Sequence, residues 1–190
     1  MSNSVCPWWL GYFLLLNPIR SMIHSPEKIL KNHVNKGMFV LDIGCGMGYF
    51  SLPMAKLVGD KGSVLAIDLQ ERMLTALNRR ARKANLTNNL ETRLCSNNSL
   101  NLDDVAGKID FALAFAMVHE VPDKDRLLIE LHKALKSGGK LLIAEPKGHV
   151  KEKEFNDCLN LARSIGFNIA ERPEIGKSFS ALLTKQTLNC

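Results

Sequence analysis

The sequence lacks any pair of cysteines at C-x-x-C spacing, and its five cysteines are an odd number scattered over 190 residues. This pattern argues against a disulfide framework and against a structural zinc site, and it favours a reducing compartment. We therefore expect a cytoplasmic protein that binds no metal. The charged fraction of 23% and the apolar fraction of 46% are ordinary for a globular chain.

The sequence also has no apolar run long enough to cross a membrane. The apolar candidate, residues 5–16, has twelve residues without a charge, and it lacks the preceding lysine or arginine that is typical of a signal peptide. We expect residues 1–25 to form an aromatic cap in which Trp9 and Tyr12 contact the substrate. The alternative is a peripheral membrane contact, because tryptophan and tyrosine favour interfaces.

A third absence concerns the glycine-rich segment that follows the apolar residues 39–43. A dinucleotide site needs G-x-G-x-x-G, but Tyr49 stands at the third position counted from Gly44, and Ser51 stands there counted from Gly46. Asp68 lies about 20 residues beyond the loop, a spacing at which a carboxylate reaches a ribose. The pattern therefore predicts an adenosine-containing cofactor and disfavours a nicotinamide dinucleotide.

Strand-like and helix-like segments alternate from residue 26 onward, which predicts one domain over residues 26–190. We expect a Rossmann-like, doubly wound α/β fold. Its seven-stranded sheet would be mostly parallel, with helices on both faces and a C-terminal antiparallel hairpin. The expected helices are 26–35, 48–58, 70–84, 123–136 and 151–164, and the expected strands are 39–43, 63–67, 89–95, 109–115, 140–145, 167–174 and 179–185.

Four segments in order resemble the motifs of class I S-adenosylmethionine-dependent methyltransferases. Asp42-x-Gly44-x-Gly46-x-Gly48 resembles motif I, and "VLAIDLQ", "KIDFALAFAMVHEV" and "LKSGGKLLIAEP" resemble the second, fourth and fifth strands. The resemblance covers roughly residues 28–185 and is nearest to the small-molecule group of quinone-biosynthesis and arsenite methyltransferases. The scattered cysteines disfavour arsenite chemistry, which needs converging thiols.

The resemblance implies S-adenosyl-L-methionine as cofactor and assigns it a set of contacts. Asp42 would attract the methionine ammonium, or alternatively cap the glycine loop, and Asp68 would accept hydrogen bonds from the ribose hydroxyls. The family usually has Gly-Asp-Ala after the third strand, whereas Ser96 and Asn97 stand there in this chain. The remaining expected cofactor contacts are Gly44, Cys45, Gly46, Leu69, Phe115 and Ala116. Cys45 is interpreted as a small filler and not as a nucleophile.

His119 is the candidate catalytic residue, because it follows the strand that faces the reaction centre in the family. A histidine with a pKa near neutral can take a proton from a hydroxyl, a thiol or an acidic carbon. The alternative is a histidine that only hydrogen-bonds backbone at a helix start. Glu145 ends the fifth strand and is expected to line the substrate pocket.

The expected function is methyl transfer to a small-molecule acceptor. The segment after the fourth strand lacks the Asn/Asp-Pro-Pro-aromatic motif of enzymes that methylate base amines, which disfavours nucleic acid. Two alternatives stay open: an RNA or protein methyltransferase that uses the basic residues 79–83, and a non-catalytic S-adenosylmethionine-binding protein. The sequence leaves the oligomeric state open.

Overall fold

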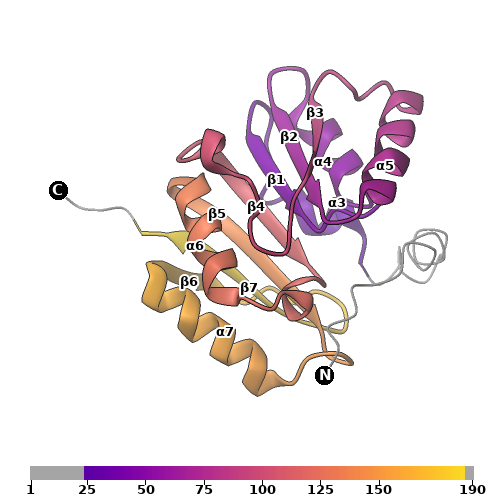
Figure 1. The fold of residues 1–190 in the computed structure, drawn as a ribbon. Coiled ribbons are helices and arrows are strands. Elements are labelled where there is room, and N and C mark those ends of the chain that lie inside the picture. The colour runs from indigo at the N-terminus through magenta and orange to yellow at the C-terminus, as the bar shows by residue number, and fades with distance from the viewer. Residues whose placement is uncertain (1–23, 187–190) are drawn as a thin grey trace. The chain divides into compact units, whose positions relative to one another are not determined.

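The computed structural model describes residues 24–186 (Figure 1). Trp9, Tyr12 and nearly all of the expected cap over residues 1–25 therefore lie outside the described residues. The chain divides into two compact units, the first ending at Cys95 and the second beginning at Ser96. The single domain over residues 26–190 stays a prediction. Among residues 24–186, no helix is both long and apolar enough to cross a membrane.

The first unit has three parallel strands in the order β3-β2-β1. Its elements are α3 (Pro26–Leu30), β1 (Phe39–Ile43), α4 (Ser51–Val58), β2 (Ser63–Asp68), α5 (Glu71–Lys83) and β3 (Leu90–Leu94). Ile43 pairs with Ile67 at the carboxyl ends of β1 and β2. The glycine loop after β1 and Asp68 at the end of β2 therefore leave the sheet side by side.

Strand β1 is covered on both faces. Its residues 40–43 are all buried, and successive strand residues point to opposite faces of a sheet. Helix α4 supplies part of this cover, since it contacts β1 as well as β2 and β3, while α5 contacts the neighbouring strands β2 and β3. Continuous burial of this kind is typical of parallel strands in α/β proteins.

The second unit combines a parallel pair with an antiparallel hairpin. Strand β4 pairs parallel with β5, and β7 pairs antiparallel with both β5 and β6. Its elements are η1 (Asp103–Val105), β4 (Ile109–Phe115), η2 (Val118–Glu120), α6 (Lys124–Ala134), β5 (Leu135–Pro146), α7 (Glu152–Ile165), β6 (Phe167–Glu171) and β7 (Ser178–Lys185). Helices α6 and α7 lie side by side (Figure 1). The seven strands confirm the expected mostly parallel α/β fold and its C-terminal hairpin.

Several element boundaries differ from the sequence-based expectations, and for three of them the structure shows the reason. Helix α4 begins at Ser51 and not at residue 48, because Gly48 has φ +83°, which no α-helix contains. Helix α3 ends at Leu30, where the His33 N–H donates to the Leu30 carbonyl in a tighter turn. Strand β5 begins at Leu135, which pairs with Ile109, and residues 136–139 bulge out before the pairing resumes.

Candidate functional site

The glycine loop between β1 and α4 follows a path that requires glycine. Gly46 has φ +53° and Gly48 has φ +83°, in the left-handed region that side chains with a Cβ disfavour. Among the described residues 24–186, no heavy atom lies within 4 Å of a Cβ placed at Gly46, whereas a Cβ at Gly48 would lie 2.2 Å from Leu77 Cδ1. Gly46 therefore presents its backbone to open space, and Gly48 allows close packing of the loop against α5.

Asp68 is held rigidly beside this loop. Its Oδ2 accepts a hydrogen bond from Gly46 N–H and its Oδ1 accepts one from Gln70 N–H, both at 2.8 Å. Asp68 is only 8% exposed, and this burial raises the pKa of its carboxyl group although the backbone hydrogen bonds oppose the rise. A carboxylate has about four acceptor positions, so each oxygen retains capacity for a further donor. The site therefore fits a ligand that brings two hydroxyl donors.

Asp42 lies inside the strand end and contacts the start of the following helix. It is 2% exposed, and its Oδ2 accepts a hydrogen bond from Ser51 Oγ at 2.5 Å. This contact ties the end of β1 to the first residue of α4, and capping of the glycine loop by Asp42 stays a prediction. Contact with an ammonium group stays a prediction. Ser51 is a residue that sequence reasoning gave no role.

Cys45 is buried within the loop. Burial, together with the negative charges of Asp42 and Asp68, raises the pKa of its thiol well above the ordinary value of 9.0. A thiol held neutral in this way is a poor nucleophile. The interpretation of Cys45 as a small filler stays a prediction.

The residues that follow β2 and β3, namely Leu69, Ser96 and Asn97, are all exposed. Leu69 is 38% exposed, which leaves an apolar surface beside Asp68. Ser96 and Asn97 are exposed in a tight turn, where the Ser96 hydroxyl accepts hydrogen bonds from Asn98 N–H and Ser99 N–H. The turn therefore uses the hydroxyl that was expected to replace the family's aspartate. A role for Ser96 and Asn97 in cofactor binding stays a prediction.

The chain changes direction sharply at the end of β4. Ala116 has φ +56°, an uncommon value for alanine, and its N–H donates to the Ala144 carbonyl at 2.7 Å. Phe115, the last residue of β4, pairs with Ala144 on β5. This bend carries the next residues back over the end of β5. Contacts of Phe115 and Ala116 with a cofactor stay a prediction.

The bend brings His119 onto Glu145, a contact that no local pattern revealed. His119 Nδ1 forms a short hydrogen bond to Glu145 Oε2, and Glu145 is 2% exposed. The histidine side chain itself remains 23% exposed. A buried carboxylate that orients a partly accessible imidazole is an arrangement suited to proton transfer. Both residues were singled out in the sequence, but their pairing was not.

The His119–Glu145 pair should make the stability of the fold depend on pH. The hydrogen bond to Glu145 raises the pKa of His119 above its ordinary value of 6.5. A group that binds its proton more tightly when folded stabilises the fold fully below its unfolded pKa, and loses this contribution as pH rises through the folded pKa. We expect the difference in free energy of unfolding between the wild type and His119→Gln to be larger near about pH 5.5 than near about pH 8.5. Urea unfolding at both pH values measures it, and a difference that is flat or grows with pH would contradict the pairing.

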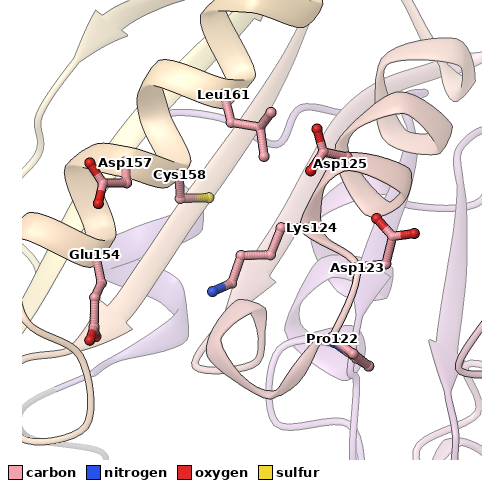
Figure 2. A pocket seen from close by; sticks show the side chains of 8 residues that line it. All are labelled: Pro122, Asp123, Lys124, Asp125, Glu154, Asp157, Cys158 and Leu161. Atoms are coloured by element: carbon pink, nitrogen blue, oxygen red, sulfur yellow. The ribbon is translucent and has the colours of Figure 1, made fainter.

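A hollow of about 430 Å³ lies between α6 and α7. Figure 2 shows Lys124 extending from the start of α6 toward α7, where Cys158 and Leu161 face it. Burial raises the pKa of the Cys158 thiol, while the positive charge of Lys124 opposes the rise. The residues that line the hollow are Pro122, Asp123, Lys124, Asp125, Glu154, Asp157, Cys158 and Leu161. None of them belongs to the predicted site.

The basic cluster on α5 includes one residue with a structural role. Arg80 Nη1 donates a hydrogen bond to the Met47 carbonyl in the glycine loop, and burial lowers the pKa of the guanidinium. Arg80 therefore supports the loop from the helix beside it. Because Arg80 is engaged in this contact, fewer basic side chains among residues 79–83 can contact nucleic acid.

The comparisons with known proteins agree with this geometry. The model of the methyltransferase domain family matches residues 34–186. The chain is 30% identical over 146 residues to the demethylmenaquinone methyltransferase of Lactobacillus johnsonii, a match that covers 73% of this chain and 59% of that protein. It is 32% identical over 123 residues to the ubiquinone/menaquinone biosynthesis C-methyltransferase UbiE of Shewanella sp. (strain W3-18-1), covering 63% and 48%. The chain thus spans about half the length of these curated relatives.

A solved structure matches over nearly the whole chain. The SAM dependent methyltransferase from Aquifex aeolicus has a TM-score of 0.83 and 27% identity, and the match covers 95% of this chain and 99% of that one. The resemblance inferred from the four motifs is confirmed, and so is the fold that it implied. Since the family model covers most of the sequence, this chain belongs to the methyltransferase domain family.

Proposed function

We propose that this chain binds S-adenosylmethionine and transfers its methyl group to a small-molecule acceptor. The single observation that carries the cofactor is the Asp68 carboxylate, which Gly46 N–H and Gln70 N–H fix at the exit of two neighbouring parallel strands. Ligands of such sheets bind beyond the carboxyl ends of the strands. Ribose hydroxyls would supply the further donors that this buried carboxylate can accept.

The residues around Asp68 suit the rest of the cofactor. Gly46 leaves room for a ligand against its backbone, and Leu69 offers an apolar surface to an adenine ring. Asp42 places a buried negative charge at the end of β1, where it would favour the methionine ammonium. When bound, S-adenosylmethionine supplies a methyl carbon that the positive sulfur has already activated.

His119 would act on the acceptor as a general base. Its side chain is partly exposed, and Glu145 on Nδ1 leaves Nε2 as the nitrogen that can receive a proton. Proton loss from a phenolic hydroxyl raises the electron density of the neighbouring ring carbons, which then attack a methyl group. The relatives named for quinone biosynthesis support an acceptor of this hydroquinone-like class.

A transfer assay tests the proposal directly. The purified chain would be incubated with methyl-labelled S-adenosylmethionine and either a reduced quinone that carries an unsubstituted ring position, bulk RNA or a mixture of proteins. We expect label in the quinol and none in the macromolecules. Label in RNA or protein would support the alternative of an RNA or protein methyltransferase. Cofactor binding without any transfer would support a non-catalytic role.

Replacing Asp68 by Ala should weaken S-adenosylmethionine binding by about 1–3 kcal/mol, because the ribose hydroxyls and the backbone amides of Gly46 and Gln70 lose their hydrogen-bond acceptor. This corresponds to roughly a 5- to 150-fold increase in the dissociation constant. Calorimetric titration of the variant measures the change. Asp60→Ala is the matched control, because Asp60 is an exposed acid away from the glycine loop. Equal affinity of the Asp68 variant and the wild type would show that the ribose contact is wrongly assigned.

A further inference from the structure

Glu145 is a buried acid whose place in the fold the cofactor contacts do not explain. It lies near the end of β5, one residue beyond Ala144, which pairs with Phe115 at the end of β4. Its neighbour on the other side is Phe179 of β7. A carboxylate that is 2% exposed in the middle of a sheet is costly unless several donors compensate its charge.

Three donors from one short segment meet this carboxylate. Oε1 accepts hydrogen bonds from Met117 N–H at 3.1 Å and from Val118 N–H at 2.9 Å, and Oε2 contacts His119 Nδ1. The two backbone hydrogen bonds to Oε1 fix the orientation of the carboxylate, so Oε2 points in one defined direction. Residues 117–119 are thereby tied to the end of β5 at three points.

This geometry determines which nitrogen of His119 carries the proton. A carboxylate only accepts hydrogen bonds, so Nδ1 must be the protonated nitrogen of the neutral imidazole. Nε2 then holds the free lone pair and is the nitrogen that can take a proton from an acceptor. We propose, on the basis of the proposed function, that Glu145 is a positioning residue that holds His119 in the Nδ1–H tautomer with Nε2 ready to act as the base.

The proton balance of the step follows from this arrangement. Nε2 takes the proton of the acceptor hydroxyl, and the acceptor carbon forms the new bond to the methyl carbon. The bond between the methyl carbon and sulfur breaks, and its electron pair stays on sulfur. The imidazolium that results carries a positive charge beside the Glu145 carboxylate, which stabilises it. The methylated ring carbon then loses its own hydrogen as a proton while the oxygen regains one, which restores the aromatic ring, and His119 releases to water the proton that it took. Atoms and charges balance without any further reactant.

Other charged and titratable groups surround His119. The Glu120 carboxylate lies 4.0 Å from Nε2, and its charge raises the pKa of His119. The charge of Lys124 at the start of α6 lowers it. The His149 ring meets the His119 ring edge-on at 5.6 Å between centroids. Of these groups, only Glu145 contacts Nδ1, so only its replacement should change the tautomer.

The decisive variant is Glu145→Gln, which keeps the shape of the side chain. The amide oxygen can still accept from Met117 and Val118, but the amide NH₂ then faces His119 Nδ1 and forces that nitrogen to accept. The proton moves to Nε2, and the base is lost. We expect kcat to fall by roughly 10²- to 10⁴-fold, the range that a general base contributes, with the affinity for S-adenosylmethionine unchanged and the pKa of His119 lowered. Glu120→Gln is the matched control, which should lower the pKa of His119 without moving the proton.

Nitrogen-15 NMR of the histidine ring reads the tautomer and the pKa independently of turnover. We expect the Nδ1–H form in the wild type and in Glu120→Gln, and the Nε2–H form in Glu145→Gln. An Nε2–H tautomer in the wild type would refute the proposal. This spectrum tests the proposal even if the Glu145→Gln variant fails to fold. Loss of activity in Glu145→Gln with the tautomer and pKa unchanged would also refute it, because that pattern reports only structural damage. Failure of the wild type to transfer methyl groups, with the Nδ1–H form present, would instead refute the proposed function.

Discussion

Replacing His119 by Asn is expected to lower kcat by about 10²- to 10⁴-fold, the range that a general base contributes. Asparagine can keep one hydrogen bond to Glu145, but it cannot take a proton at neutral pH. In the wild type, the rate should rise with pH as His119 loses its proton, and the midpoint should lie above 6.5 because Glu145 raises the pKa. The variant should lose this dependence.

Single-turnover assays across pH measure the loss of His119, and calorimetry on the same variant measures cofactor binding. The affinity for S-adenosylmethionine should stay within a few-fold of the wild type, since His119 is assigned to the acceptor. His132→Asn provides the control, because that histidine packs against Phe167 on β6. Retention of most of the activity by His119→Asn would show that the acceptor loses its proton without this base.

Replacing Gly48 by Ala is expected to destabilise the fold by about 2–5 kcal/mol. A residue with a Cβ pays about 1–2 kcal/mol for the left-handed conformation at φ +83°. The new methyl group would also overlap Leu77 Cδ1, and overpacking of a core costs about 1–3 kcal/mol. Leu77 is fully buried on α5, so it has little room to move. Urea unfolding measures the change.

Gly46→Ala separates the two costs of the Gly48 substitution. Gly46 also has a positive φ, but no heavy atom in the part of the chain that the structure describes lies within 4 Å of its added Cβ. We expect this variant to lose only about 1–2 kcal/mol of stability and to bind S-adenosylmethionine more weakly, because the methyl group enters the space left for the ligand. Leu77→Ala should partly rescue Gly48→Ala, since their effects are coupled. Equal destabilisation by the two glycine variants would contradict the packing role of Gly48.

The sequence pattern predicted the elements that local chemistry determines. The apolar runs at β1 and β4 gave the bounds 39–43 and 109–115 as the structure has them. The sequence pattern gave the wrong boundary where the backbone geometry of one residue overrides the helical periodicity of its neighbours. Gly48 lies inside a helix-like pattern, but its positive φ delays α4 to Ser51.

The candidate site was predicted residue by residue but not as a set of contacts. Gly46 and Asp68 were both named, yet the bond between them joins residues far apart in sequence, and it depends on the parallel pairing of β1 and β2. The His119–Glu145 contact depends in the same way on the pairing of Phe115 with Ala144. The sequence showed only that two polar residues, His119 and Glu145, lie near the ends of consecutive predicted strands. The pairing of the two strands is needed to predict that they touch.

Calorimetric titration of the wild-type chain with S-adenosylmethionine, S-adenosylhomocysteine and NADH tests the central claim most directly. The glycine loop and Asp68 predict binding of both sulfur compounds, weakened in Asp68→Ala, and no heat with NADH. Binding of NADH without binding of either sulfur compound would contradict the account.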